Sequence, residues 1–311
     1  MATTITGAGG ISATIIADSI NGNGDRLVTY EFVYPRWILA EVDTHRILSK
    51  NSASSRAVPV ASMFEQIENS PAMPVHWGEN QPGMTSKVEL DFLKKESAKL
   101  MWVSAAKTMV SFARILSDKM GINGHKQWVN RLCENFTFTK TVITGTHWEN
   151  FFWLRHHPDA QPEFQELARC AYEARQLSTP TLLRPGEWHL PYVQFKDGQY
   201  WVDELTIVDL ETAKMISVSC CAQVSYRKLD DSIEKARKIF DMLNIGSNVK
   251  PAHASPLEHQ GTPMNVFESM PFFPSTWEEG ITHVRKDCTM WSGNLCGWIQ
   301  FRQLIPNEAK W

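Results

Sequence analysis

A polar and basic segment between Thr44 and Arg56 holds the densest set of groups that could bind an anion. The cations Arg46, Lys50 and Arg56 lie here among five hydroxyl side chains and Asn51. An arginine holds a phosphate with a planar fork of N–H groups, while hydroxyls and free backbone amides complete the shell around the anion. A solvated helix end followed by a serine-rich loop has the same composition, so that interpretation stays open. The low hydrophobicity directly after an apolar segment favours the anion site.

Arg155 is the second candidate, because it closes the apolar run Asn150–Arg155 (NFFWLR). This composition predicts burial, and a buried arginine must be paired or bind a ligand, since an unpaired buried charge is strongly destabilising. An ion pair with Glu149 or Asp159 would meet that need without any ligand. Taken alone, the ion pair is the simpler interpretation.

The segment His253–His259 (HASPLEH) is the third candidate. Ser255 and Glu258 have the spacing of a capping box, with a proline at the first helical position. The capping box leaves His253 and His259 unexplained, and histidines at a helix N-terminus suit a phosphate or an electron-rich ring. An ordinary capped helix remains the simpler interpretation.

Composition narrows the class of protein. The 311-residue chain has a formal net charge of -3, so it lacks a global basic field for duplex nucleic acid, and we expect no nucleic-acid partner. No apolar stretch approaches the roughly 18 residues of a membrane span, and the N-terminal segment lacks the basic start of a signal peptide. Six cysteines without a C-x-x-C pair indicate reduced, mostly buried thiols and a cytoplasmic protein. Neither a phosphate loop, a dinucleotide-binding glycine fingerprint nor zinc-type Cys/His spacing is present, so we predict no metal site.

Local patterns predict a mixed α/β chain with long helices, few strands and no clear linker. A glycine-rich start, loose or strand-like, precedes a strand over 26–34. We expect helices from Pro35 through 37–49, from a Ser86–Glu89 capping box to Gly121, over 124–134 and 144–156, from Pro162 to Arg175, from an Asp209 cap to Ser225, and over 230–244. We expect a long ordered loop over 57–84, a hairpin turn at Asp197-Gly198 and irregular structure over 262–294.

The three candidate segments together resemble the flavin-dependent thymidylate synthases. That family carries the signature R-H-R-x7-S followed shortly by Arg. Here 44–46 read Thr-His-Arg, Ser54 stands after seven further residues, and Arg56 follows. Residues 49–56 are likewise similar to the family's S-x-N-x-x-S-x-R. Thr44 replaces the first Arg of the signature, which belongs to the flavin side of the family's site.

Other segments resemble the family in a different order. Residues 150–161 are similar to its later N-F-L-x-L-R helix and the A-Q that follows, with Asp159 where the family often has His. HASPLEH is similar to H-E-S-P-F-E-H, and Ala222–Tyr226 (AQVSY) to A-R-V-S-Y, yet the family places both segments before R-H-R. Residues 27–46 resemble the strand and helix after S-P-F-E-H. A circular permutation that moved the opening segment to the C-terminal part explains this order.

The resemblance touches about half of the chain and is weak in 57–120 and 262–311. It implies a flavin-dependent thymidylate synthase-like mixed α+β fold, with several long helices around a small mixed sheet, in permuted order and as a single domain over 1–311. Family members carry a one-carbon unit from methylenetetrahydrofolate to C5 of dUMP, giving dTMP. Their FAD supplies the hydride after reduction by NADPH, and no cysteine nucleophile is used. They are homotetramers with active sites at subunit interfaces, which we also expect here, and a permuted nucleotide enzyme would suit a phage chain acting in the host cytoplasm.

The resemblance also assigns roles to particular residues. Arg155 would stabilise negative charge that develops on the pyrimidine as C5 becomes nucleophilic. The predicted catalytic residues are Arg155, Arg46 and Ser54. The predicted substrate-binding residues are Glu41, Ser54, Arg56, Arg131 and Arg155. The predicted cofactor-binding residues, lining the flavin, are His45, Arg46, Asn150, His253, Ser255 and Glu258.

Glu41 bears on which pyrimidine is used. It stands three residues before Thr44, where the family commonly has Gln, and a carboxylate can only accept hydrogen bonds. A ring with an amino group, as in dCMP, would suit it, although an ion pair with Arg36 or Arg46 is the simpler interpretation. The alternatives to dUMP methylation are methyl or hydroxymethyl transfer to dCMP or dUMP for base modification, a nucleotide-binding homologue that has lost catalysis, and, more distantly, a thiol-dependent enzyme.

Overall fold

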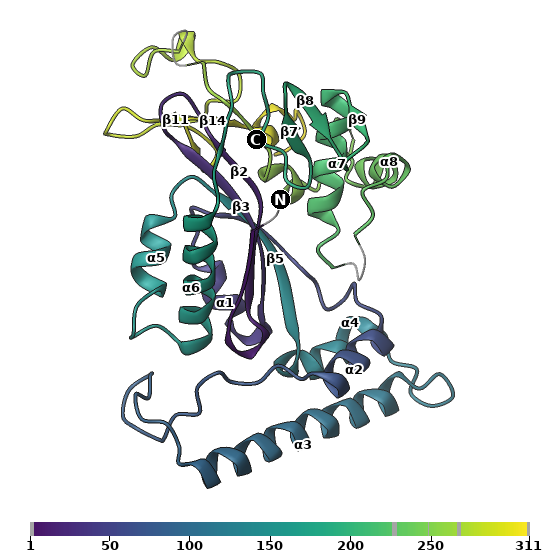
Figure 1. Cartoon of the computed structure of the whole chain (residues 1–311). Coiled ribbons are helices and arrows are strands. Elements are labelled where there is room, and N and C mark those ends of the chain that lie inside the picture. The colour runs from purple at the N-terminus through teal and green to yellow at the C-terminus, as the bar shows by residue number, and fades with distance from the viewer. Residues whose placement is uncertain (1–2, 226–228, 248, 266–268, 310–311) are drawn as a thin grey trace.

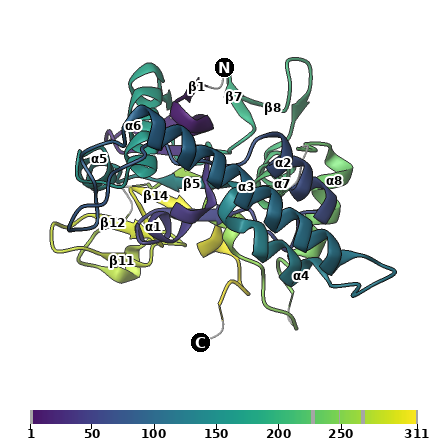
Figure 2. The same ribbon diagram turned by 90° about the horizontal axis from the view of Figure 1, so that it is seen from below.

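The computed structural model describes residues 3–225, 229–247, 249–265 and 269–309, and it has the mixed helix-and-sheet class that the sequence predicts. Within these residues the α-helices are α1 (Leu39–Asp43), α2 (Val60–Asn69), α3 (Phe92–Ser117), α4 (Lys126–Val129), α5 (Glu149–Arg155), α6 (Pro162–Leu177), α7 (Leu210–Ala222) and α8 (Ile233–Met242). Figure 1 shows a long sheet in the middle, with α5 and α6 to one side of it and α7 and α8 to the other. Helices α2, α3 and α4 form a separate layer below, which faces the viewer in Figure 2.

The main sheet is antiparallel apart from one short edge strand. Its strands, in spatial order, are β1 (Thr3–Thr6), β2 (Ser12–Ile20), β3 (Arg26–Pro35), β5 (Phe138–Gly145) and β4 (Ser49–Ser52), and β6 (Thr181–Leu182) pairs in parallel with β2. The predicted strand over 26–34 is confirmed as β3, whose Tyr30, Phe32 and Tyr34 are fully buried. Along β3 the register runs from Val28 opposite Gly145 to Pro35 opposite Phe138.

Helices α5 and α6 cover the sheet and close its main core. The apolar residues of α6 that are fully buried recur at helical spacing, and Pro162 occupies the first turn, where its missing N–H is not needed. They meet Phe32, Trp148 and Phe151, which are also at most 2% exposed. Burying side chains of this size contributes roughly 2 kcal/mol each, so this core holds α5 against the end of the sheet.

The lower layer corrects one prediction and confirms another. Residues 57–84 contain helix α2, whose Met63, Phe64 and Ile67 pack against α3. The apolar spacing of three and four residues was present in the sequence, but the surrounding Pro, Gly and Met residues obscured it. The helix expected over 124–134 exists as α4 followed by the 3₁₀-helix η3 (Asn130–Phe136).

Helix α3 begins later than the predicted capping box at Ser86–Glu89. Asp91 is the N-cap, and its side chain accepts a hydrogen bond from the Lys94 amide, whereas the Ser86 hydroxyl donates to the Val88 carbonyl. We expect Asp91→Ala to lower the melting temperature by about 2 °C, because the first turn loses the acceptor for an unpaired amide. Ser86→Ala, measured in the same thermal unfolding experiment, should leave the melting temperature unchanged; equal losses in both variants would contradict Asp91 as the cap.

The upper part of the chain follows its local signals closely. The hairpin of β7 (Gln194–Lys196) and β8 (Gln199–Trp201) turns at Asp197 and Gly198, whose φ angles of 53° and 75° match the predicted tight turn. β8 also pairs with β9 (Ile207–Val208). Asp209 caps α7 as predicted, accepting from the Thr212 amide, and α8 occupies the helix expected over 230–244.

The C-terminal part is made of short strands and turns. These are η4 (Ser255–Glu258), β10 (Gly261–Pro263), η5 (Pro274–Thr276), β11 (His283–Val284), β12 (Met290–Ser292), β13 (Leu295–Cys296), β14 (Trp298–Gln300) and η6 (Phe301–Leu304). We call 283–296, the three-stranded unit β11–β13, the C-terminal arm. The capping box predicted at Ser255 and Glu258 is wrong, because η4 is a single 3₁₀ turn without a side-chain cap.

The segments that carry the motifs are shorter than predicted. The helix expected over 37–49 is η2 (Arg36–Ile38) followed by α1, and 49–52 is strand β4. The helix expected over 144–156 starts only at Glu149, because Thr144 and Gly145 end strand β5. Ser49 and Thr144, which were both expected in helices, are opposite each other in the antiparallel pair of β4 and β5. Backbone pairing between distant strands thus overrides the local helical pattern.

Three further observations concern the described part of the chain. None of its helices is long and apolar enough to cross a membrane. Its six cysteines form no disulfide there, and all but Cys288 are buried. No group of three or more acidic, histidine or cysteine side chains among those residues could hold a metal ion.

Candidate functional site

A cavity of about 430 Å³ lies between the turn after α1 and helix α5. Four of the predicted site residues line it, His45, Arg46, Asn150 and Arg155, together with Thr44, Ile47, His147, Glu149 and Leu154. The volume falls in the range of small-molecule sites, roughly 300–1,000 Å³. The cavity therefore joins the two segments that the sequence singled out independently, 44–56 and 150–161.

Arg155 is held in the cavity wall by neutral partners. Its Nε donates to His45 Nε2 at 3.0 Å, one terminal nitrogen donates to the Thr44 hydroxyl at 3.3 Å, and the guanidinium lies 4.6 Å from the Phe164 ring centre. Within the described residues no carboxylate pairs with Arg155. Glu149 pairs instead with Arg175 and Asp159 with Lys87, so the ion pair considered from the sequence is not formed.

His45 is suited to accept the hydrogen bond from Arg155. Burial, followed by the charges of Arg155 and Lys50, lowers the pKa of His45 to about 4, so its ring is neutral near pH 7. The ring packs edge-on against Phe151 and Phe164, with centre separations of 5.1 and 5.7 Å. The neutral ring and its aromatic contacts fix the direction in which Arg155 points.

The turn that carries Arg46 is tied down by a lysine. Lys50 Nζ donates to the carbonyls of His45 and Leu48 at 2.6 and 2.9 Å, and the Leu48 amide donates to the same His45 carbonyl. Burial lowers the pKa of Lys50. The Arg46 side chain lines the cavity, is exposed, and has no polar partner in the described part of the chain. A cation in that position is available to an anionic ligand.

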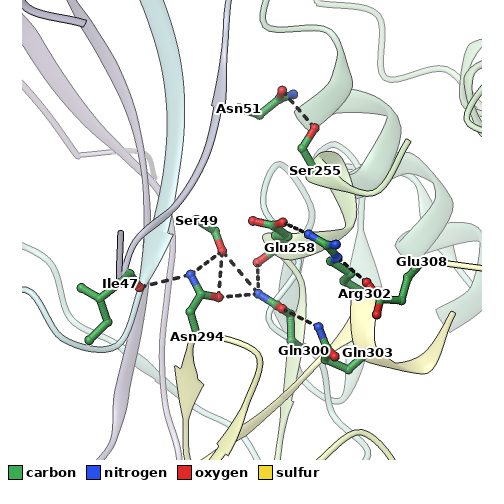
Figure 3. Close-up of polar contacts among 10 residues, drawn as sticks. All are labelled: Ile47, Ser49, Asn51, Ser255, Glu258, Asn294, Gln300, Arg302, Gln303 and Glu308. Atoms are coloured by element: carbon green, nitrogen blue, oxygen red, sulfur yellow. Dashed lines mark hydrogen bonds and ion pairs between the residues drawn. The ribbon is translucent and has the colours of Figure 1, made fainter. Parts of the chain in front are cut away.

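Next to the turn that lines the cavity, Ser49 is the centre of a partly buried polar network (Figure 3). Asn294 Nδ2 donates to the Ile47 carbonyl at 3.1 Å and to Ser49 Oγ at 2.9 Å. Gln300 Nε2 donates to Asn294 Oδ1 at 2.8 Å and to the Glu258 carbonyl at 3.0 Å. The network thus joins the signature strand β4, the 3₁₀ turn η4 and the C-terminal arm.

The HASPLEH segment lies beside β4 although some 200 positions separate them in sequence. The Ser255 hydroxyl donates to Asn51 Oδ1 at 3.5 Å, and the Glu258 carboxylate pairs with Arg302 (Figure 3). His253 is exposed. None of the three predicted cofactor-binding residues of this segment lines the cavity, so their flavin role stays a prediction.

The other predicted substrate residues lie at the far end of β4. The Ser54 amide donates to the Ser225 hydroxyl at 2.9 Å, and Arg56 and Arg131 are exposed with no polar partner among the residues that the structure describes. None of these three residues lines the cavity, so their substrate-binding role stays a prediction. The structure divides the predicted site residues into two groups. Tyr226, which ends the AQVSY segment, lies outside the described residues.

Glu41 has neither of the partners considered for it. Arg36 lies 3.3 Å from Glu134 instead, and no ion pair joins Glu41 to Arg46 within the described ranges. One carboxylate oxygen of Glu41 is buried and has no hydrogen-bond partner there. Because Glu41 does not line the cavity, contact with a pyrimidine at that place stays a prediction.

Sequence reasoning missed two residues around the cavity. His147 lines it, and the centre of its ring lies 4.9 Å from the ring centre of Trp291 of the C-terminal arm. Asn294 fixes the Ile47 carbonyl from the same arm. The residues 262–311 lie where the family resemblance is weak, and contacts across about 250 positions leave no local signal in one sequence.

No family model matches the chain, and no curated protein matches it. Among solved structures, the chain is similar to the flavin-dependent thymidylate synthase ThyX from Helicobacter pylori complexed with FAD and dUMP, with 20% identity over 48% of this chain and 67% of that one and a TM-score of 0.33. It is also similar to the UMP/dUMP methylase PolB from Streptomyces cacaoi bound with 5-Br UMP, with 14% identity over 53% and 93% of the two chains and a TM-score of 0.39.

Proposed function

We propose that this chain transfers a one-carbon unit from methylenetetrahydrofolate to C5 of a pyrimidine deoxynucleotide, converting dUMP to dTMP with FAD as cofactor. The observation that carries this function is the cavity in which Arg155, Arg46 and His45 meet. Arg155 and His45 are 110 positions apart in sequence and in direct hydrogen-bond contact. The two segments that supply them are those that resemble the two motifs of the flavin-dependent thymidylate synthases.

The proposed role of Arg155 follows from its contacts. A guanidinium has five N–H donors, and the contacts to His45 and Thr44 leave donors for a ligand. Its orientation is set before any ligand arrives, so little reorganisation accompanies the development of negative charge on a pyrimidine ring beside it. Arg46 on the adjoining turn would hold the ligand's anionic group.

The walls of the cavity suit a flavin or a pyrimidine ring. Ile47 and Leu154 supply apolar surface, and the Asn150 amide can both donate to and accept from a ring edge that alternates carbonyl and N–H groups. When bound, FAD supplies the hydride, with NADPH as its reductant. The neutral His45 keeps Arg155 in place without neutralising its charge.

We further propose that the active site is completed at a subunit interface of a homotetramer. Ser54, Arg56 and Arg131 do not line the cavity that Arg155 lines, so a nucleotide bound by all of them would need a site that extends beyond this cavity. The exposure of Arg56 and Arg131 supports contact with a ligand bound partly by another copy of the chain.

The buried cysteines favour a mechanism without a thiol nucleophile. Burial raises the pKa of Cys133 and Cys296 to about 11 and that of Cys220 to about 12. Thiols with such pKa values are protonated near pH 7 and are poor nucleophiles. None of the six cysteines lines the cavity.

The experiment that tests the function is mass spectrometry of the product formed by purified protein with FAD, NADPH and methylenetetrahydrofolate, offered dUMP and dCMP separately. We expect dUMP to gain a methyl group. A hydroxymethyl gain, or a gain on dCMP alone, would move the function to base modification. No gain on either nucleotide, with FAD bound, would contradict catalysis and leave a nucleotide-binding protein. A Cys133→Ser and Cys221→Ser pair should keep full activity.

A further inference from the structure

The C-terminal arm forms the rear support of the cavity. Trp291 backs the ring of His147, and the Cys296 amide donates to the Thr146 hydroxyl at 3.2 Å, just before α5. Asn294 reaches the opposite wall, where its side chain meets the turn between α1 and β4. The arm therefore contacts both segments that line the cavity.

Asn294 makes a contact with the turn that no other described side chain makes. The carbonyls of His45 and Leu48 are held by Lys50 from within the same segment. The Ile47 carbonyl, on the opposite side of that turn, is held by Asn294 Nδ2. Besides the restraints from Lys50 and from the contacts of the His45 ring, this bond ties the turn to a segment about 250 positions away in sequence.

The amide of Asn294 is itself oriented by its neighbours. Gln300 Nε2 donates to Asn294 Oδ1, which leaves the Nδ2 group facing Ile47 and Ser49, as Figure 3 shows. Ser49 is 2% exposed and Gln300 1% exposed, while Asn294 is partly buried between them and the turn. Buried polar groups with all partners in place specify one geometry.

We propose that Asn294 is a positioning residue of the cavity: it fixes the Ile47 carbonyl and thereby the direction in which His45 and Arg46 present their side chains. It acts through the turn and does not touch the ligand. The identity of the ligand in the cavity rests on the proposed function. The restraint of the turn by Asn294 does not depend on that function.

The test compares Asn294→Ala with Asn307→Ala. Asn307 is a matched control, because its Nδ2 also donates to two carbonyls, those of Asn244 and Lys250, and its Oδ1 also accepts a hydrogen bond, yet it lies away from the cavity. We expect Asn294→Ala to speed hydrogen–deuterium exchange of the 44–50 peptide and to weaken FAD binding about tenfold. Asn307→Ala should leave both measurements unchanged.

Each outcome decides the question. Exchange at 44–50 that is equal in the two variants, or equal to that of the original protein, overturns the positioning role. If the original protein binds no FAD, the proposed function fails, while the exchange measurement still decides the positioning role. If Asn294→Ala does not fold, the milder pair Asn294→Ser and Asn307→Ser replaces it, with the same expected contrast.

Discussion

Replacing Arg155 by lysine is expected to lower kcat/KM for dUMP by about 100-fold or more. A lysine keeps the positive charge but has a single ammonium group on a flexible stem. It cannot bond His45 and Thr44 while also presenting a planar fork to a ligand, as the guanidinium is placed to do. The measurement is steady-state kinetics with dUMP varied at saturating FAD, NADPH and folate.

Arg114→Lys is the control for this substitution. Arg114 also lies over a phenylalanine ring, 5.1 Å from the centre of Phe64, and bonds Glu68 through one terminal nitrogen, but it belongs to the lower helical layer. The Arg114→Lys variant should have the same kcat/KM for dUMP as the original protein. Arg155→Lys with unchanged kcat/KM would remove Arg155 from the catalytic residues, and with it the main support for the proposed chemistry.

Acidification from pH 7 to pH 5 is expected to destabilise the folded protein through two buried histidines. His189 and His259 are at most 1% exposed, and burial lowers the pKa of each from 6.5 to about 3. The unfolded chain takes up a proton on each ring near pH 6.5, whereas the folded chain does not until about pH 3. The folded state therefore has its full stability above pH 6.5 and loses about 2 kcal/mol per histidine by pH 5.

The free energy of urea unfolding at pH 7 and pH 5 measures this effect. One chain of hydrogen bonds links the two histidines through Ser19, Thr29 and Thr144. A glutamine in place of each histidine can keep some of these hydrogen bonds, and it does not take up a proton. The double variant His189→Gln/His259→Gln should lose less stability between the two pH values than the original protein does. His253→Gln, at an exposed position, should leave the loss of unfolding free energy between the two pH values unchanged. A pH dependence that is identical in the double variant would contradict the assignment to this pair.

Elements with strong local signals could be predicted from the sequence, and those fixed by distant pairing could not. Helix α6 was marked by Pro162 and helix α7 by its Asp209 cap. Strand β5 was missed because its last residues, Thr144 and Gly145, read as the start of the next helix. What makes them a strand is their pairing with β3 and β4, which no window of the sequence contains.

The same distinction applies to the candidate site. Resemblance to a family singled out His45 and Arg155 as separate site residues, and the structure shows a hydrogen bond between them that the resemblance did not specify. Ser54, Arg56 and Arg131 were expected to bind the substrate together with Arg155, and they do not line the cavity that Arg155 lines. Asn294 was not foreseen, because it lies in a region of weak resemblance and acts on a backbone carbonyl, which any residue supplies.

The network at Ser49 also constrains when this protein can first become competent during its synthesis. Ser49 leaves the ribosome early, yet its partners Asn294 and Gln300 follow 245 and 251 positions later. Until then the Ser49 hydroxyl and the Ile47 carbonyl lack the side-chain partners that they have in the folded protein. A ribosome-bound chain halted before position 294 would thus contain every residue that lines the cavity and still lack the bond from Asn294, so the proposed restraint of the turn can form only after the C-terminal arm has been translated.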